Sequence, residues 1–479
     1  MSTALLSRAS YGAKPRRPIN VLQIGDGVFL RGFVDWMIDV ANEKGVASFG
    51  VAVARARPHA DPPQLAAQDG LFTVLERGRV DGADFERRRI VTCVEIAFDP
   101  HSEAQLLRKL AESRDLGFVV SNTTEAGIVE ATEPYDPAVC PQNFPAKVAW
   151  LLKARFDALG GREAPGLTFL PCELIEANGQ TLRRIALAAA ERWGFGSAFR
   201  EWVQGRCRFL DTLVDRIVPG FPSDDAEQLF AAWGYRDALA LIAEPYHLWA
   251  IEGDLAQDWP LAEAGLNVIW TRDLKPYREA KLRMLNGVHT ALAPTAFLAG
   301  LDTVGEAIRD PLFSRYLNTL MFAEIAPRVP LPPEQREAYA RSVLERFANP
   351  FLRHELISIT LNSVSKWRTR LLPIVKHAAA ATGEPPALVA FSFAALLLFY
   401  RGKAERGAYP LRDEPAALAL MASAWEDSER AADQLIRESR LWGEDLSTMP
   451  GFANSVQTAI AAIETLGVRD ALTRRLAVG

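Results

Sequence analysis

The segment KLRMLNGVHT, residues 281–290, carries three polar side chains at a spacing that suits acid–base chemistry. On an α-helix turning about 100° per residue, Lys281, Asn286 and His289 fall within an arc of about 140°. A buried lysine loses affinity for its proton and can exchange it near neutral pH. An amide can donate to a developing alkoxide, and a histidine can orient a hydroxyl. These groups suit metal-free carbonyl/alcohol interconversion, although the spacing alone favours a solvated lysine, a capping asparagine and a packed histidine.

A glycine turn in VLQIGDGVFLRGF, residues 21–33, is the second chemical signal. A predicted strand ends at Gly25 and a helix begins a few residues later. Gly25 and Gly27 allow a tight turn that a pyrophosphate can approach, and the helix N-terminus offers free N–H groups to an anion. The usual third glycine of G-x-G-x-x-G is Leu30 here, with Gly32 two residues on, so an ordinary strand-to-helix turn also fits.

The end of the second predicted strand, VAVARARPHAD, has no acid where a partner for the adenosine ribose is usually found. Arg55 and Arg57 stand there instead, and Asp61 follows. An arginine could meet a 2′-phosphate, which favours NADP, or could stack on adenine or face solvent. The choice between NAD and NADP therefore stays open at this point.

The segment VVSNTTEAGI, residues 119–128, runs from an apolar strand into small polar residues and Glu125. Such residues are typical of the carboxyl end of a central strand, where ligands bind, so Asn122 and Thr123 are candidate cofactor contacts. A capped helix start, with Thr124 or Asn122 as the cap, is an equal alternative.

Alternating strands and helices must position these residues in the first half of the chain. A helix is expected at 33–45, and the alternation predicts a doubly wound, mostly parallel sheet. The expected strands are 20–25, 49–56, 72–78, 88–98, 117–124, 166–174 and 266–274. From about residue 276, spacings of three and four among Ala, Leu, Glu and Arg predict helices and no strand, with a buried helix at 388–400. We therefore expect an α/β, Rossmann-like dinucleotide-binding domain at 1–275. A mostly α-helical substrate-binding and catalytic domain is expected at 276–479.

The composition agrees with a two-domain globular protein of 479 residues, 49% of them hydrophobic. A net charge of −5 gives no reason to expect a nucleic-acid partner. Four scattered cysteines without CxxC spacing favour a reducing compartment. No apolar stretch reaches the roughly 20 residues of a membrane span. We expect a cytoplasmic protein, monomeric or weakly oligomeric, that has no membrane partner.

The chain as a whole resembles the mannitol dehydrogenase family of polyol-specific long-chain dehydrogenases. Lys281-x4-Asn286-x2-His289 matches that family's K-x4-N-x2-H motif, and IGDGVFLRGFVDW resembles its N-terminal turn. SNTTEAGI, PCELIEANG, LVDRIVPG and RFANPFLRHELISITLNSVSKWRTRLLP look like further family blocks in the right order. The resemblance runs from about residue 18 to the C-terminus. Several blocks are nearer to members that act on sugar acids, which implies reversible, NAD-dependent reduction of a keto sugar acid without zinc.

The resemblance also implies roles for individual residues. Lys281 would be the general acid/base, Asn286 would donate to the carbonyl oxygen, and His289 would orient the substrate. Glu125 matches a glutamate involved in proton release. The cofactor turn is matched by Gly25, Gly27, Phe29 and Arg31.

Two departures from the family pattern stand out. Relatives carry C-D-N where this chain has Cys172-Glu173-Leu174, so a second oxyanion donor is missing at Leu174. Asn178, in the same loop, is the candidate replacement. In the glycine turn, Val28 and Leu30 replace the Asn or Gly and the His of many relatives.

A sugar-acid carboxylate needs a partner that polyols do not. The segment SKWRTR supplies Lys366, Arg368 and Arg370, and a bidentate arginine is the natural choice. We expect Arg368 or Arg370 to bind it, with Lys275 as a further candidate, although a solvated basic face fits equally well. Three functional alternatives remain: a family member with another sugar-acid or polyol substrate, an NADP-dependent sugar reductase, and a non-catalytic sugar-acid sensor.

Overall fold

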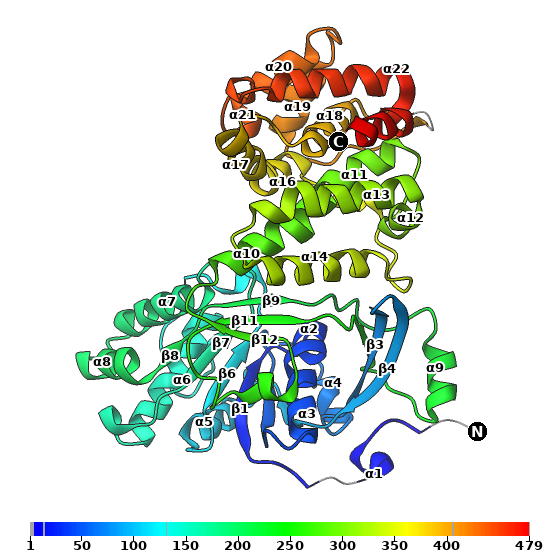
Figure 1. The fold of residues 1–479 in the computed structure, drawn as a ribbon. Helices are drawn as coiled ribbons and strands as arrows, with labels where there is room; N and C mark the ends of the chain where they lie inside the picture. Colours follow the sequence, from blue (N-terminus) through cyan, green and yellow to red (C-terminus); the bar gives the residue numbers. More distant parts are fainter. Residues whose placement is uncertain (1–3, 13–14, 131, 405–406, 479) are drawn as a thin grey trace. The chain divides into compact units, whose positions relative to one another are not determined.

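The computed structural model describes residues 4–12, 15–130, 132–404 and 407–478 (Figure 1). The chain forms two compact units. The first holds residues up to Arg77 together with Phe85–Leu274. The second holds the hairpin tip 78–84 and the residues from Lys275 onward.

A six-stranded parallel sheet forms the centre of the first unit (Figure 1). Its order is β5 (Val94–Phe98), β2 (Gly50–Ala54), β1 (Ile19–Ile24), β6 (Phe118–Ser121), β7 (Thr168–Pro171) and β8 (Arg208–Phe209). The order reverses on either side of β1, which is the topology of a doubly wound nucleotide-binding fold. The predicted α/β fold class is therefore confirmed, and the switch point lies between β1 and β6.

Helices cover both faces of this sheet because its strands bury side chains on both sides. On β1, Val21 joins one core and Leu22 joins the other. The first face packs against one continuous helix made of α2 (Val28–Leu30), the π-helical η1 (Arg31–Asp35) and α3 (Trp36–Glu43). The second face packs against α5 (Ala104–Glu112), α6 (Phe144–Ala158), α7 (Asn178–Arg192) and α8 (Ser197–Arg206).

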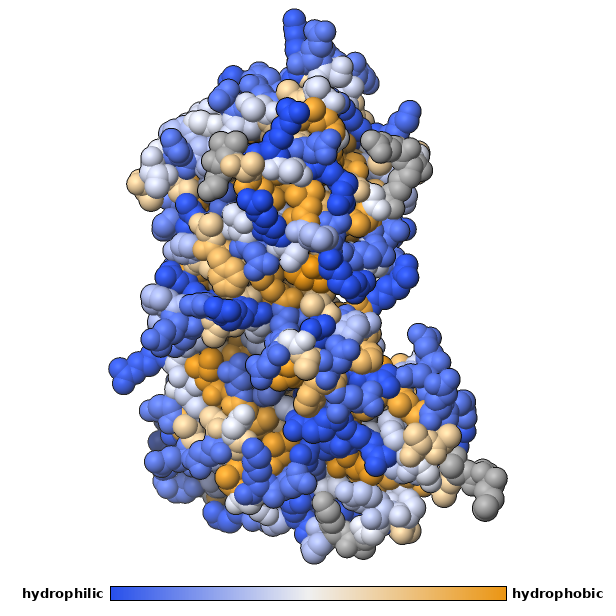
Figure 2. Space-filling model, turned by 45° about the vertical axis from the view of Figure 1, so that its right-hand side comes forward, coloured by the Kyte–Doolittle hydropathy of each residue, from blue (hydrophilic) through white to orange (hydrophobic). Residues whose placement is uncertain are grey.

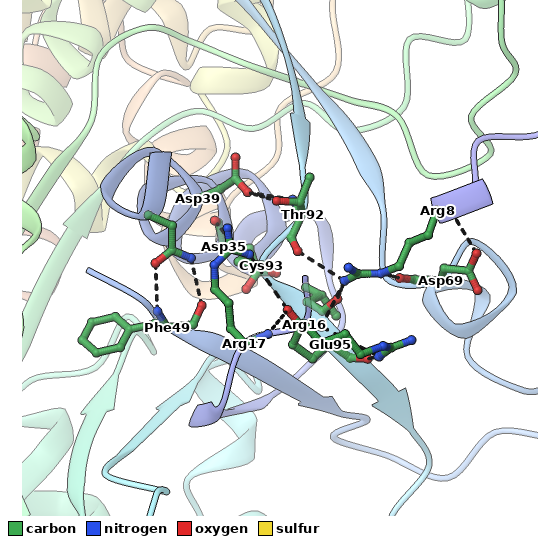
Figure 3. Close-up of polar contacts among 12 residues, drawn as sticks. Arg8, Arg16, Arg17, Asp35, Asp39, Phe49, Asp69, Thr92, Cys93 and Glu95 are labelled. Atoms are coloured by element: carbon green, nitrogen blue, oxygen red, sulfur yellow. Dashed lines mark hydrogen bonds and ion pairs between the residues drawn. The ribbon is translucent and has the colours of Figure 1, made fainter. Parts of the chain in front are cut away.

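Two predicted strands differ from those observed. The run 88–98 is two strands, because β4 (Ala83–Val91) ends before β5 begins and pairs in a separate sheet with β3 (Phe72–Val80) and β10 (Leu241–Ala243). Between them, the Asp39 carboxylate binds the Thr92 backbone N–H at 2.7 Å and its hydroxyl at 2.9 Å (Figure 3). The run 266–274 contributes β12 (Val268–Thr271) to a mixed sheet with β11 (Leu248–Glu252) and β9 (Thr212–Asp215).

Three arginines near the N-terminus, Arg8, Arg16 and Arg17, contact Glu95 of the edge strand β5. The Glu95 side chain is buried (Figure 3). The Arg8 guanidinium lies 3.2 Å from the Glu95 carboxylate, and the Arg17 backbone N–H donates to it at 3.1 Å. Arg16 also donates to the Glu95 carbonyl. These contacts cover an edge of the sheet that would otherwise be open.

The second unit is helical around the buried helix α18 (Ala387–Phe399), which packs against α11 (Val288–Leu298) and α22 (Phe452–Val478) (Figure 1). The predicted buried helix at 388–400 is confirmed. One departure is a short antiparallel strand pair, β13 (Lys403–Ala404) with β14 (Gly407–Ala408). The second unit also contains α10 (Lys275–Ala280), the π-helical η5 (Lys281–Gly287), α14 (Pro333–Phe347) and α16 (Ser363–Arg370).

Hydrophilic residues dominate the face drawn in Figure 2, with smaller hydrophobic areas between them. Within the described residues, no helix combines the length and the apolar character needed to cross a bilayer.

Candidate active site

The glycine turn lies at the carboxyl end of β1, where the topology places a ligand. Gly25 has φ +119° and donates its N–H to the Ala54 carbonyl at 2.8 Å. A β-carbon at Gly25 would lie 3.0 Å from the Asn122 carbonyl oxygen, so the turn needs glycine there. At Gly27 an added β-carbon would meet no atom within 4 Å. Gly27 is exposed and begins the long helix without a side-chain cap, so the open turn and its N–H groups fit a pyrophosphate.

Two further predicted cofactor residues support the turn from inside. Phe29 is half-buried and stacks on Phe33 with ring centroids 5.0 Å apart. Arg31 is buried, and its guanidinium donates to the Asp26 carbonyl at 3.2 Å and the Leu239 carbonyl at 2.7 Å. Burial lowers the pKa of Arg31. Arg31 thus fixes the backbone of the turn, and its contact with the cofactor stays a prediction.

The loop after β6 is held by the buried carboxylate of Glu173. Thr123 donates its N–H at 2.9 Å and its hydroxyl at 3.0 Å to one oxygen, and Ser121 donates its hydroxyl to the other at 3.1 Å. Burial raises the pKa of Glu173, and these hydrogen bonds act in the opposite direction. The Thr123 hydroxyl is thus engaged with protein, whereas half-buried Asn122 makes one side-chain bond, to the Cys172 carbonyl at 3.4 Å.

Sequence reasoning did not assign Glu173 this role. The sequence feature that indicates this role is the acid in PCEL at the end of one buried strand, because that strand lies beside the strand that ends in SNTT. The loop also contains Thr124 at φ +75°, a conformation that non-glycine residues rarely adopt, so the loop shape is strongly constrained. Glu125 begins a short 3₁₀ turn, Glu125–Gly127, and its predicted side-chain role lies outside what the structure describes.

Asn178 cannot replace the oxyanion donor missing at Leu174. Its side chain is buried, and its NH₂ group donates to the carbonyls of Pro171, Glu173 and Thr212 at 3.0, 3.0 and 3.1 Å. Its side-chain oxygen accepts from the backbone as well. The substrate-binding prediction for Asn178 is therefore wrong, because its hydrogen bonds already hold the end of β7. Leu174 itself is 59% exposed.

The candidate catalytic segment in the second unit is a π-helix, η5, that continues into α11. Hydrogen bonds in a π-helical turn join residues five apart, whereas those in an α-helix join residues four apart. Lys281 and Asn286 are five apart, so they lie on one face rather than about 140° around the axis. Both side chains are half-buried. The π-helix thus places positions 281 and 286 nearer to one face of the helix than α-helical geometry predicts.

His289 follows on α11 and is packed between rings. It stacks on Phe347 with centroids 4.1 Å apart and meets the edge of His354 at 4.9 Å. Burial lowers the pKa of His289 far below its usual value, and the charges of Arg346, Arg370 and Lys366 act in the same direction, as does His354. Its buried Nε2 has no hydrogen-bond partner among the described residues. A neutral imidazole with an unpaired nitrogen is suited to a substrate hydroxyl.

A cationic cluster from α16 lies beside this segment. Arg370 donates to the Asn286 carbonyl at 3.3 Å and to the Thr290 hydroxyl at 3.1 Å. Lys366 is half-buried and donates to the Ile359 carbonyl at 2.9 Å. Burial lowers the pKa of both cations; for Lys366 the charge of Arg370 lowers the pKa further, and the charge of Asp413 acts in the opposite direction. Two half-buried cations beside Asn286 and His289 can receive a carboxylate.

The other predicted carboxylate partners lie elsewhere. Arg368 is exposed and lines a separate pocket of about 320 Å³ together with Arg440 and Asp413. It stands two residues from Arg370, which on an α-helix is the opposite face. Of the two predicted arginines, the structure brings only Arg370 to Asn286. Lys275 is exposed at the start of α10.

The two arginines that suggested NADP also differ from each other. Arg55 is buried and pairs with Asp26 of the glycine turn at 3.3 Å, whereas Arg57 is exposed. The described residues include no group of three or more His, Cys, Asp or Glu side chains placed to hold a metal ion.

Two family models together match most of the chain. The mannitol dehydrogenase Rossmann domain matches residues 19–262, and the mannitol dehydrogenase C-terminal domain matches residues 273–464. An altronate oxidoreductase of Halalkalibacterium halodurans is 39% identical over 476 residues, covering 95% of this chain and 93% of that protein. An altronate oxidoreductase of Bacillus subtilis is 39% identical over 473 residues, covering 98% and 97%.

Solved structures show the same fold. A D-sorbitol dehydrogenase in substrate-free form has a TM-score of 0.80 at 22% identity, covering 98% of this chain and 100% of that one. The Pseudomonas fluorescens mannitol 2-dehydrogenase, in a ternary complex with NAD and D-mannitol, has a TM-score of 0.67 at 23% identity, covering 100% and 98%.

Proposed function

This chain belongs to the mannitol dehydrogenase family of oxidoreductases, and we propose that it reduces D-tagaturonate to D-altronate with NADH, and catalyses the reverse reaction with NAD. Its similarity to altronate oxidoreductases over nearly the whole chain supports this substrate pair. The structural observation that carries the proposal is the cationic cluster of Arg370 and Lys366 beside Asn286.

The cluster favours a sugar acid because cations removed from water gain most from a charged partner. Arg370 and Lys366 are half-buried, and their hydrogen bonds go to neutral backbone or hydroxyl oxygens, while the charge of Asp413 acts on Lys366. An arginine can bind a carboxylate through two parallel hydrogen bonds. A polyol offers no such charge and would leave the Arg370 guanidinium hydrogen-bonded to neutral oxygens.

The chain's own residues would handle the proton. Lys281 would deliver a proton to the carbonyl oxygen during reduction and remove it during oxidation. The Asn286 amide would donate to the charge that develops on that oxygen. His289, neutral at physiological pH because burial lowers its pKa, would orient a substrate hydroxyl through Nε2.

The glycine turn fits a dinucleotide because Gly27 leaves open space above the helix N-terminus. Gly25, Gly27 and the first N–H groups of α2 would hold its pyrophosphate, and Asn122 would contact it from the neighbouring loop. The bound cofactor supplies a hydride to the carbonyl carbon. Residues 1–275 would therefore serve as the cofactor domain and residues 276–479 as the substrate domain.

We also propose a cytoplasmic location. All four cysteines are buried and unpaired, as expected for a chain that folds in a reducing compartment. A monomer or weak oligomer stays a prediction.

A second candidate substrate is D-fructuronate, because the same cluster would accept its carboxylate. Purified protein should be offered D-tagaturonate, D-fructuronate and D-fructose with NADH and with NADPH, and turnover followed by loss of absorbance at the NADH band. D-tagaturonate with NADH should give the highest kcat/KM. Preference for D-fructose would refute the carboxylate argument, and preference for D-fructuronate would reassign the substrate. Preference for NADPH would refute the assignment of NAD(H) as the cofactor. No turnover with any pair would favour a sugar-acid sensor.

A further inference from the structure

We propose that Asp26, within the glycine turn, accepts hydrogen bonds from the adenosine ribose and thereby selects NAD(H) over NADP(H). This inference rests on the proposed function only in requiring that the chain binds a nicotinamide dinucleotide. It does not depend on the identity of the sugar acid.

The end of β2 lacks the acid that usually binds the ribose, and the arginine found there is already engaged. Arg55 is buried, its Nε donates to the Asp26 carboxylate at 3.3 Å, and another nitrogen donates to the Pro62 carbonyl at 3.0 Å. It also donates to the Asp61 carbonyl. Arg55 is therefore held in place by three oxygens, one of which carries a negative charge.

Asp26 reaches the position that the missing acid would occupy. In doubly wound folds the pyrophosphate lies over the first turn, and the ribose lies between that turn and the end of the second strand. Asp26 sits between Gly25 and Gly27, and its ion pair with Arg55 spans these two sites. Its backbone is fixed by Arg31, which donates to the Asp26 carbonyl at 3.2 Å.

The Asp26 carboxylate remains available for a ligand. Its side chain is 40% exposed, and Arg55 uses one of its oxygens, Oδ2. Among the described residues, no hydrogen bond to the other oxygen, Oδ1, is found. A carboxylate oxygen accepts hydrogen bonds from the two hydroxyls of a ribose, which is the recognition that an acid at the end of β2 normally provides.

The same pair also explains why an arginine at this position need not favour NADP. The Asp26 charge offsets that of Arg55, and a 2′-phosphate would bring two further negative charges against the carboxylate. Without the carboxylate, Arg55 would carry an uncompensated charge at the ribose and would attract the phosphate. Replacing Asp26 should thus change the binding of the two cofactors in opposite directions.

The test is equilibrium binding of NADH and NADPH to the full chain without substrate, followed by nicotinamide fluorescence. Wild type should bind NADH more tightly. In Asp26→Asn, loss of a charged acceptor should raise the Kd for NADH about tenfold. The Kd for NADPH should fall, so the ratio of the NADPH Kd to the NADH Kd drops by about tenfold or more. Asp26→Glu, which keeps the carboxylate, should retain the wild-type preference.

A matched control is Asp61→Asn, which removes an exposed carboxylate from the same region. This variant should leave the ratio of the two Kd values unchanged, because it is the Asp61 backbone carbonyl, which the substitution keeps, that accepts from Arg55. Equal weakening of both cofactors in Asp26→Asn, or an unchanged ratio, would overturn the inference and leave the proposed function intact. Failure of wild type to bind either dinucleotide would overturn both.

Discussion

Replacing Arg370 by alanine should reduce activity selectively toward substrates that carry a carboxylate. Arg370 is half-buried on α16, and its guanidinium lies 3.3 Å from the Asn286 carbonyl and 3.1 Å from the Thr290 hydroxyl. Burial lowers its pKa, so its charge is poorly solvated and should gain from an anionic partner. Removing it takes away the strongest hydrogen bond that the carboxylate is expected to make.

The size of the effect follows from the type of contact. A hydrogen bond between charged groups contributes about 1.5–3 kcal/mol, which corresponds to a fall of roughly 10- to 150-fold in kcat/KM. Arg370→Lys should lie between wild type and alanine, because lysine keeps the charge but cannot bind a carboxylate through two parallel bonds. Kinetics should be measured with D-tagaturonate and with D-fructose, which lacks the carboxylate.

Arg368→Ala is the matched control, because Arg368 stands two residues away on the same helix but lines a different pocket. It should leave kcat/KM for D-tagaturonate within about twofold of wild type, as expected for an exposed side chain away from the site. The reasoning is refuted if Arg370→Ala slows both substrates equally, since its role would then be structural. It is also refuted if Arg368→Ala produces the selective loss.

Three further predictions concern single residues. Lys281→Ala should abolish most turnover while NADH still binds with wild-type Kd, and activity that largely survives would exclude Lys281 as the proton donor. Gly27→Ala should keep wild-type stability, because φ is −65° and the site is open, yet should weaken NADH binding by about tenfold as the methyl group meets the pyrophosphate; unchanged binding would argue against the turn as the cofactor site. Asp35, hydrogen-bonded to Gln23 at 3.2 Å, has its pKa raised by burial to about 7. Asp35 binds its proton more tightly in the folded protein than in the unfolded chain. Its contribution to the free energy of unfolding is therefore fully present below about pH 4, and about 4 kcal/mol is lost as the pH rises through 7. Asp35→Asn should remove this dependence in urea unfolding at pH 5 and pH 8, and an unchanged pH slope would contradict it.

The sheet and the glycine turn could be predicted because local patterns determine them. Buried parallel strands read as apolar runs, and Gly25 and Gly27 mark where the first one ends. The apolar run 88–98 could not be divided into β4 and β5 from the sequence, because its residue types do not show which sheet each part belongs to. That boundary depends on Asp39 of α3, whose carboxylate accepts hydrogen bonds from Thr92.

The spacing of Lys281 and Asn286 was visible in the sequence, but the π-helix that aligns them was not. A π-helical turn depends on packing around the helix, and the residue types in this segment are compatible with an α-helix as well. In α16 as well, the sequence does not show which of Arg368 and Arg370 faces Asn286. Trp367, which precedes both arginines, is buried on the inner face of α16, and Arg370 rather than Arg368 contacts Asn286.

For Asn178 and Arg31, the sequence shows a suitable side chain but does not show the hydrogen-bond partners that the fold provides. Both have side chains suited to binding a ligand, and both donate to backbone carbonyls of distant segments. Those partners come from other elements of the fold, so the sequence alone does not reveal that the donors are already used.

The most direct test is the ratio of kcat/KM for D-tagaturonate to that for D-fructose, measured with NADH on the wild-type chain. Reduction to D-altronate at a kcat/KM at least about a hundredfold above that for D-fructose is expected, since a charged contact of about 3 kcal/mol distinguishes the two substrates. Equal values, or a preference for D-fructose, would contradict recognition of a sugar-acid carboxylate by Arg370 and Lys366.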